Sequence, residues 1–188
     1  MLRKPYAEIS HVGLTVHDFD KMLAFYLRFF DFHISDEKLY DNGRQVAFLT
    51  MDPNDHHQLV LGSGRHEEFG FNPVNQISFR TDSLASVRRY WKSCMAEHEV
   101  EIQRTLTHGN AWSVYFFDPE RNRLEVYADT PWQVTQPYGE SIDFNQSDEE
   151  IYKFTDDLVH NEEYCEPFVD WRHKTAAAMG LEDWPIRE

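Results

Sequence analysis

A carboxylate and an imidazole lie in strand-like segments where their neighbours are mostly apolar. Glu125 stands between Leu124 and Val126, and His11 stands within residues 9–16. Burying an ionised carboxylate among large aliphatic side chains costs free energy unless a partner compensates its charge. A divalent cation bound jointly by Glu125 and His11 would be such a partner. The two residues therefore predict a metal site, provided that the fold brings their strands together.

The elements that would position these residues form a β-α-β-β-β pattern that occurs twice. The first copy is expected to have a helix capped by Asp18 or Asp20 and strands at residues 9–16, 32–38, 44–50 and 57–61. The second copy is expected to have a helix starting at residues 81–83 and strands at residues 74–80, 100–105, 111–117 and 123–128. Asp-Asn-Gly at residues 41–43 indicates a hairpin turn.

The spacing of the chemically interesting residues follows this repeat. His11 and Gln76 are 65 residues apart, and His57 and Glu125 are 68 apart. A repeated unit that cannot bury its apolar face alone is expected to pair with its copy. We therefore predict an α+β fold in which paired β-α-β-β-β modules form a curved, open, barrel-like sheet with a central cleft. The modules span about residues 8–61 and 74–128, joined by a linker at 62–73.

Alternation along the strands predicts which side chains face the cleft. Val12, Leu14 and Val16 would face the helix, which leaves His11 on the opposite side. The same reasoning sends Gln76 and Ser78, and then Glu125 and Tyr127, into the cleft. The strand at residues 57–61 is ambiguous, because Leu59 and Leu61 share a face with His57.

The chain divides into the duplicated domain at residues 1–130 and an acidic, partly helical extension at residues 131–188. From Asp129 onward there are 15 acidic and 4 basic side chains, so −11 of the net charge of −15 lies there. Ser147 and Glu150 fit a capping box, with Ile151, Phe154 and Leu158 at helical spacing behind it. We expect this extension to pack on the body of the protein or on a partner subunit.

Composition limits the function further. A net charge of −15 argues against binding to a nucleic-acid backbone. No apolar run approaches the ~20 residues of a membrane span. Two cysteines in 188 residues do not suggest a disulfide framework. We expect a cytoplasmic protein, a homo-oligomer, whose partners are small molecules rather than nucleic acid or membrane.

Four segments of the chain resemble active-site segments of one family. Residues 57–61 resemble a strand with an acid–base histidine, and residues 108–112 resemble a loop with a second active-site histidine, here two residues shorter. Residues 115–119 resemble a segment with a substrate-contacting tyrosine, and residues 123–127 resemble a strand with a carboxylate ligand. The family is the vicinal oxygen chelate superfamily of glyoxalases, bleomycin resistance proteins and extradiol dioxygenases. Within it, the chain is most similar to one-domain type I extradiol catechol dioxygenases, especially the homoprotocatechuate 2,3-dioxygenase type.

This resemblance implies a metal-dependent dioxygenase that cleaves the ring of a catechol-like aromatic with dioxygen. The family's iron site has two histidines and one carboxylate, with open positions for both reactants. The implied ligands here are His11, Gln76 and Glu125, and Gln76 stands where the family has its second histidine. His57 would be the acid–base residue, and His108 and Tyr115 would hydrogen-bond the substrate oxygens.

Because Gln76 replaces a histidine, more than one metal and more than one reaction fit the ligand set. An amide oxygen is a weaker ligand for Fe(II) than imidazole, so Mn(II), Zn(II) or Ni(II) are alternatives to the expected Fe(II). Glyoxalase-type members of the superfamily use a glutamine on an opening strand. A glyoxalase-like lyase or isomerase, with His57 as a fourth ligand, is therefore a second hypothesis. A metal-free binding protein, like the resistance proteins of the superfamily, is the third.

Overall fold

The computed structural model describes residues 9–66, 74–181 and 183–187 of the chain. It contains two compact units, one formed by Met1–Pro73 with Pro119–Arg121 and the other by Val74–Asp118 with Asn122–Glu188. Part of the predicted linker, residues 67–73, lies outside the described residues. No helix in the described part of the chain has the length and apolarity needed to cross a membrane.

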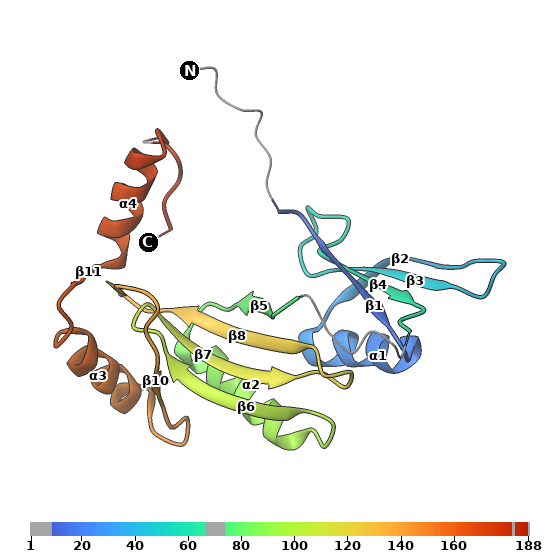
Figure 1. Cartoon of the computed structure of the whole chain (residues 1–188), viewed down its shortest axis with the longest axis horizontal. Coiled ribbons are helices and arrows are strands. Elements are labelled where there is room, and N and C mark those ends of the chain that lie inside the picture. Colours follow the sequence, from blue (N-terminus) through green and yellow to red (C-terminus); the bar gives the residue numbers. More distant parts are fainter. Residues whose placement is uncertain (1–8, 67–73, 182, 188) are drawn as a thin grey trace. The chain divides into compact units, whose positions relative to one another are not determined.

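The first unit is a four-stranded sheet with one helix on it (Figure 1). Its elements are β1 (Val12–Val16), α1 (Phe19–Phe30), β2 (His33–Leu39), β3 (Gln45–Thr50) and β4 (Leu59–Ser63). The strand order is β1-β4-β3-β2, with β1 parallel to β4 and the other pairs antiparallel. Helix α1 packs on β4, and its buried face consists of Phe19, Met22, Phe25, Tyr26 and Phe30.

Helix α1 begins where its amide groups find acceptors. Asp18 is the N-cap, and its side chain accepts a hydrogen bond from the Lys21 amide at 3.0 Å. Glu120, from the β7–β8 turn, accepts hydrogen bonds from the amides of His17 (2.8 Å) and Asp18 (2.7 Å). A carboxylate at this end of a helix satisfies amides that have no intrahelical partner. The helix ends at Asp31, which adopts the left-handed conformation with φ 58°.

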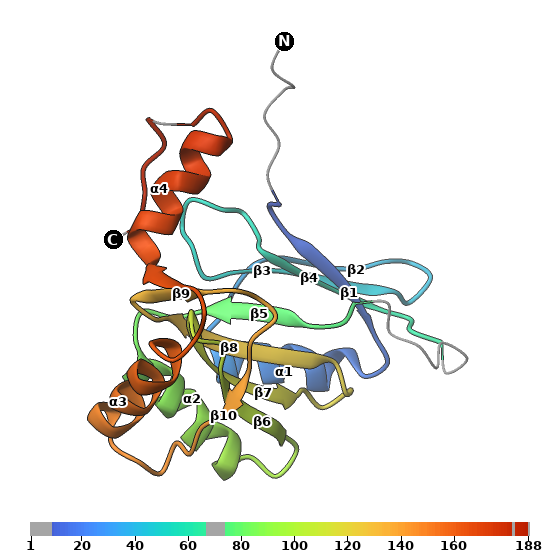
Figure 2. The same ribbon diagram turned by 60° about the vertical axis from the view of Figure 1, so that its left-hand side comes forward.

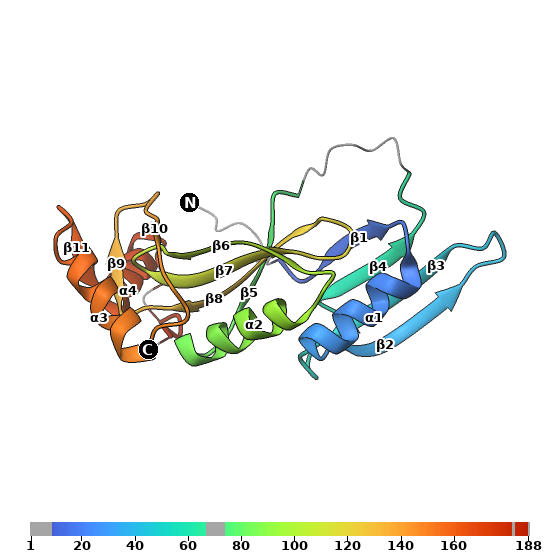
Figure 3. The same ribbon diagram turned by 90° about the horizontal axis from the view of Figure 1, so that it is seen from below.

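The second unit repeats this arrangement and extends it (Figure 2). Its sheet has the order β10-β6-β7-β8-β5, and a separate pair joins β11 to β9. Helix α2 packs on β6, β7 and β8 (Figure 3). The elements of this unit are β5 (Ile77–Arg80), α2 (Leu84–Ala96), β6 (Glu101–Thr107), β7 (Ala111–Phe117), β8 (Arg123–Asp129), β9 (Trp132–Val134), β10 (Glu140–Ser141), α3 (Asp148–Val159), β11 (Cys165–Pro167) and α4 (Phe168–Ala178).

The duplication is confirmed in detail. The order β1-β4-β3-β2 corresponds to β5-β8-β7-β6, and the opening strand is parallel to the closing strand in both units. Both units also have a register shift at the equivalent place, between Ile34 and Asp36 in β2 and between Ile102 and Arg104 in β6. The predicted α+β class with two β-α-β-β-β modules is therefore correct.

Strand register corrects one equivalence that the spacing suggests. Val12 pairs with Leu59 and Ile77 pairs with Leu124, so His11 and Gln76 hold equivalent positions, as predicted. The same register makes Val60, not His57, the counterpart of Glu125. The spacing of 68 residues misleads because β4 begins at Leu59 and His57 lies in the loop before it.

The acidic extension packs on the second unit. The predicted capping box is present, with the Ser147 hydroxyl accepting from the Glu150 amide and the Glu150 carboxylate accepting from the Ser147 amide. The buried face of α3 consists of Ile151, Thr155 and Val159, whereas Phe154 is 41% exposed. Thr155 lies four residues from both Ile151 and Val159, so it shares their face, and its hydroxyl is satisfied there by a hydrogen bond from Trp112 Nε1 in β7 at 2.8 Å.

Candidate functional site

In the first unit, two imidazole rings lie side by side just before the first residues of β1 and β4. The ring centroids of His11 and His57 are 4.4 Å apart. His11 precedes β1 by one residue, and the Val12 amide donates to the Gln58 carbonyl, which aligns the two segments. The His57 ring also stands edge-on to Phe48 of β3, with centroids 5.1 Å apart. Two potential metal ligands, or one ligand and one base, are thus adjacent.

A chain of polar contacts orients the His57 ring. His56 Nε2 lies 2.9 Å from Asp36 Oδ2, and His56 Nδ1 lies 2.9 Å from His57 Nδ1. When His56 is neutral, its Nε2–H donates to the carboxylate and its Nδ1 accepts from His57 Nδ1–H. His57 Nε2 then carries a free lone pair, which can accept a proton or bind a metal.

The electrostatic surroundings favour the neutral form of His57. Partial burial, with repulsion from His11 and His56, holds the pKa of His57 below its ordinary value of 6.5. The group is therefore largely unprotonated at neutral pH, as a general base or a metal ligand must be.

In the second unit, Glu125 is the hub of a hydrogen-bond network. Glu125 is 7% exposed. Its Oε2 accepts hydrogen bonds from Ser78 Oγ at 2.5 Å and from Gln76 Nε2 at 2.8 Å. Gln76 Nε2 also donates to Ser78 Oγ at 3.0 Å. Both N–H groups of the Gln76 side-chain amide are therefore used in hydrogen bonds to Ser78 and Glu125. The amide oxygen of Gln76, the atom that would bind a metal, accepts no hydrogen bond from the described residues.

Tyr115 joins this network from the neighbouring strand. It pairs with Glu125 in the β7–β8 register and is 4% exposed. Burial and the neighbouring Glu125 carboxylate raise the pKa of Tyr115 far above its ordinary value, while the guanidinium of Arg104, 4.7 Å from the ring centroid, opposes this. The phenol stays protonated and can donate to an anionic oxygen.

His108 is held against Tyr115 by a contact with the extension. Its Nδ1 lies 2.6 Å from the carbonyl oxygen of Tyr138, and its Nε2 lies 2.9 Å from the Tyr115 hydroxyl. A carbonyl only accepts, so Nδ1 carries a proton. Nε2 can then accept the hydrogen bond of the Tyr115 hydroxyl. His108 thus orients the Tyr115 hydroxyl next to Glu125.

The structure groups the predicted site residues into two sets. His11 lies with His57 in the first unit, and Gln76, Glu125, Tyr115 and His108 lie together in the second. Within the described residues of either unit, no three His, Cys, Asp or Glu side chains are arranged to hold a metal ion. The predicted ligand set therefore draws on both units, and it remains a prediction.

Two kinds of residue at these sites have no signal in the local sequence. Asp36 and His56 orient His57, and a carboxylate 20 residues away in the chain gives no local signal of that contact. The Tyr138 carbonyl that fixes His108 is a backbone group from a different segment. Its role depends on tertiary structure alone.

Comparison with known proteins assigns the chain to a family. Residues 8–126 match the Glyoxalase/Bleomycin resistance protein/Dioxygenase superfamily. Among curated proteins, biphenyl-2,3-diol 1,2-dioxygenase 2 of Rhodococcus globerulus is 27% identical over 144 residues, which cover 68% of this chain and 67% of that protein.

Solved structures agree on the fold. Fosfomycin resistance protein FosX from Listeria monocytogenes, complexed with Mn(II) and sulfate, is 21% identical with a TM-score of 0.54, covering 66% of this chain and 94% of that chain. A glyoxylase/bleomycin resistance protein/dioxygenase domain from Frankia sp. EAN1pec is 21% identical with a TM-score of 0.54, covering 66% and 99%. The chain belongs to the Glyoxalase/Bleomycin resistance protein/Dioxygenase superfamily.

Proposed function

We propose that the protein is a divalent-metal-dependent dioxygenase that cleaves the ring of a catechol-like aromatic. One observation favours a dioxygenase over the other functions of the superfamily. The first unit has Val60 at the position where the second unit has Glu125, so its strands supply one ligand, His11, rather than two. His57 comes from a loop, beside that ligand, where an acid–base residue can reach a substrate. The likeness to a biphenyl-2,3-diol dioxygenase supports the same reading.

The proposed ligands are His11, Gln76 and Glu125, and their chemistry fits a divalent cation. They combine an imidazole, a neutral amide oxygen that accepts no other hydrogen bond within the described residues, and a buried carboxylate. Fe(II) is the preferred ion, with Mn(II), Zn(II) and Ni(II) as alternatives. The proposal requires both modules to face one central cleft within a curved, barrel-like arrangement. A bound ion would act as a Lewis acid and as a template for both reactants.

The remaining residues would manage protons and substrate orientation. His57, neutral at pH 7, accepts the proton of a substrate hydroxyl and returns it later to an oxygen leaving group. Tyr115, protonated because its pKa is raised, donates a hydrogen bond to an anionic substrate oxygen. His108, whose Nε2 lies 2.9 Å from the Tyr115 hydroxyl, would hydrogen-bond the substrate oxygens together with Tyr115. Asp36 and His56 favour the proton on His57 Nδ1, which leaves His57 Nε2 as the unprotonated, reactive nitrogen.

Two other functions have specific support. The 4.4 Å separation of His11 and His57 would also suit joint metal ligation, as a glyoxalase-like lyase or isomerase with four ligands requires. Ser78 and Gln76 already satisfy the Glu125 carboxylate without a cation, as a metal-free binding protein would need.

Metal analysis of three variants distinguishes these functions. Glu125→Ala should remove the metal and the activity together, since Glu125 is the only formally charged ligand. Gln76→His should strengthen Fe(II) binding, because imidazole is the better ligand for that ion. His57→Ala should retain the metal. Loss of metal from His57→Ala would establish the four-ligand alternative, and unchanged metal content in all three would leave the binding-protein function.

A further inference from the structure

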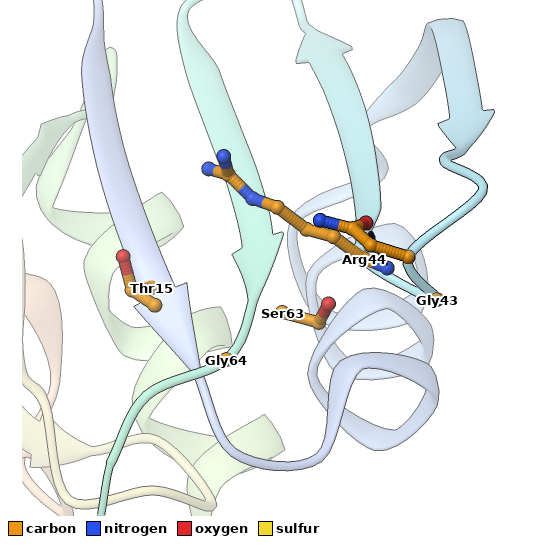
Figure 4. A pocket seen from close by; sticks show the side chains of 6 residues that line it. Thr15, Gly43, Arg44, Ser63 and Gly64 are labelled. Carbon is orange, nitrogen blue, oxygen red and sulfur yellow. Dashed lines mark hydrogen bonds between the residues drawn. The ribbon is translucent and has the colours of Figure 1, made fainter.

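A second polar site lies in the first unit, at the end of the sheet remote from His11. It is a shallow pocket of about 460 Å³ where β1, β4 and the β2–β3 turn come together. None of the residues that line it carries a carboxylate, although the chain as a whole has a net charge of −15. The lining residues are Thr15, Asn42, Gly43, Arg44, Ser63 and Gly64 (Figure 4).

Arg44 is the only charged group of the pocket lining, and the turn fixes its backbone. Its amide donates to Asn42 Oδ1 at 3.1 Å, and its carbonyl accepts from the Tyr40 amide at 2.8 Å. The side chain reaches across β4 toward β1 (Figure 4). A Cβ on Gly62 would lie 3.5 Å from Arg44 Nη2, so the guanidinium rests directly over the glycine.

The hydrogen-bond donors of this pocket are available to a ligand. Within the described residues, no carboxylate forms an ion pair with Arg44 and no acceptor binds its guanidinium. Ser63 pairs with Val16, so its side chain points to the α1 side, where Oγ accepts from the Gln45 amide at 2.8 Å. Thr15 pairs with Gly62 and presents its hydroxyl on the face where the guanidinium lies. A guanidinium beside a hydroxyl donor, with no carboxylate in the pocket lining, suits a carboxylate or another anionic oxygen group.

The pocket shares a sheet face with His11. Leu14 and Val16 are buried on the α1 side, so His11, Gly13 and Thr15 point to the opposite face. Thr15 lies four residues beyond His11, which is roughly 13 Å along a strand. Nothing lies within 4 Å of where a Cβ on Gly13 would stand, so the surface between the two ends is open.

The floor between the two ends is apolar. Val60 of β4 pairs with Gly13 of β1 and with Phe48 of β3. The side chains of Val60 and Phe48 are partly exposed. A flat aromatic body can therefore lie between the imidazoles and the guanidinium.

We propose that Arg44, with Thr15, binds a carboxylate at the far end of the aromatic substrate. This inference rests on the proposed ring-cleavage function and adds the substrate class: a catechol whose ring bears an extended, anionic substituent. The two hydroxyls lie at the His11 end and the carboxylate lies over Gly62.

A matched pair of ligands tests the proposal. We would measure, by calorimetry on the Fe(II)-loaded full chain under argon, the affinities of 3,4-dihydroxycinnamate and its neutral methyl ester. The acid should bind about three- to tenfold more tightly than the ester, as expected for one partly exposed charge-assisted contact. Arg44→Gln should remove this preference while leaving the ester's affinity unchanged, and Arg44→Lys should restore part of it. Arg28→Gln on α1 makes the same change in charge elsewhere in the unit and should have no effect.

The outcomes separate this inference from the proposed function. Absence of ring cleavage with an Arg44-dependent preference for the acid would refute the reaction but support the anion site. Ring cleavage with no preference for the acid, or a preference that survives Arg44→Gln, would overturn the anion site alone. Inorganic phosphate that binds at Arg44 without displacing the acid would also overturn it, because the site would then hold a free anion.

Discussion

Glu125→Gln is the substitution that most sharply separates metal binding from structural support. In the folded protein, Glu125 Oε2 accepts two hydrogen bonds, from Ser78 Oγ and Gln76 Nε2. Hydrogen bonds to a charged acceptor contribute about 1.5–3 kcal/mol and neutral ones about 0.5–1.5 kcal/mol. Neutralising the acceptor therefore costs about 1 kcal/mol per bond. Part of this is offset, because a neutral amide is less costly to bury than a carboxylate.

The metal-free Glu125→Gln protein should thus lose only about 0–2 kcal/mol in its free energy of unfolding. Its affinity for a divalent ion should fall much more, by at least about 100-fold or ~2.7 kcal/mol, because the proposed site loses its one formal charge. The first quantity is measured by urea denaturation of the chelator-treated protein. The second is measured by anaerobic competition for Fe(II) or Mn(II) with a chromophoric chelator.

Glu120→Gln is the matched control. Its side chain is 7% exposed and accepts two hydrogen bonds from the amides at the start of α1, and it also lies 3.7 Å from Arg65 Nη1. It should lower the free energy of unfolding by about 1–2 kcal/mol and leave metal affinity unchanged. The reasoning is refuted if Glu125→Gln binds the ion within about threefold of the wild type, or if Glu120→Gln loses the ion equally.

Three other substitutions test the roles assigned to single side chains. His57→Ala should keep its metal, measured by elemental analysis, but turn over roughly 10²–10⁴-fold more slowly. In the wild type, the rate should fall as the pH drops through the pKa of His57. Since that pKa is lowered, the fall should lie below pH 6.5 in a pH–rate profile. Tyr115→Phe should reduce kcat by about 10²-fold with unchanged metal content. Because the pKa of Tyr115 is raised, ionisation of Tyr115 should cause no loss of rate in the wild type up to pH 10. Thr155→Val should lower the free energy of unfolding by about 1–3 kcal/mol in urea, because it leaves the buried Trp112 Nε1–H without its acceptor.

Local sequence patterns were sufficient to predict much of the fold. The alternation that places Val12 and Leu14 against α1 also places His11 on the opposite face, and the structure agrees. Asp18, Ser83 and Ser147 were predicted at or near helix starts, and each is an N-cap. Such signals are predictive because strand alternation and helix capping depend on residues within a few positions of each other.

Features that depend on register or on distant partners were not predictable. The spacing of 68 residues makes His57 look equivalent to Glu125, yet the loop before β4 shifts the register and puts Val60 there. On α3, hydrophobicity favours Phe154 as a core residue, but the buried position is Thr155, whose hydroxyl finds a donor in the distant Trp112. The relay from Asp36 through His56 to His57 likewise requires contacts that no local pattern encodes.

Oxygen incorporation tests the proposed reaction most directly. The protein, purified without oxygen and loaded with Fe(II), would be mixed with a panel of catechols under ¹⁸O₂, with dioxygen uptake and product mass recorded. We expect a ring-opened product that contains both atoms of ¹⁸O₂, formed with one dioxygen consumed per substrate, and abolished in Glu125→Ala. Tight metal binding without dioxygen uptake on any catechol would contradict the proposed reaction.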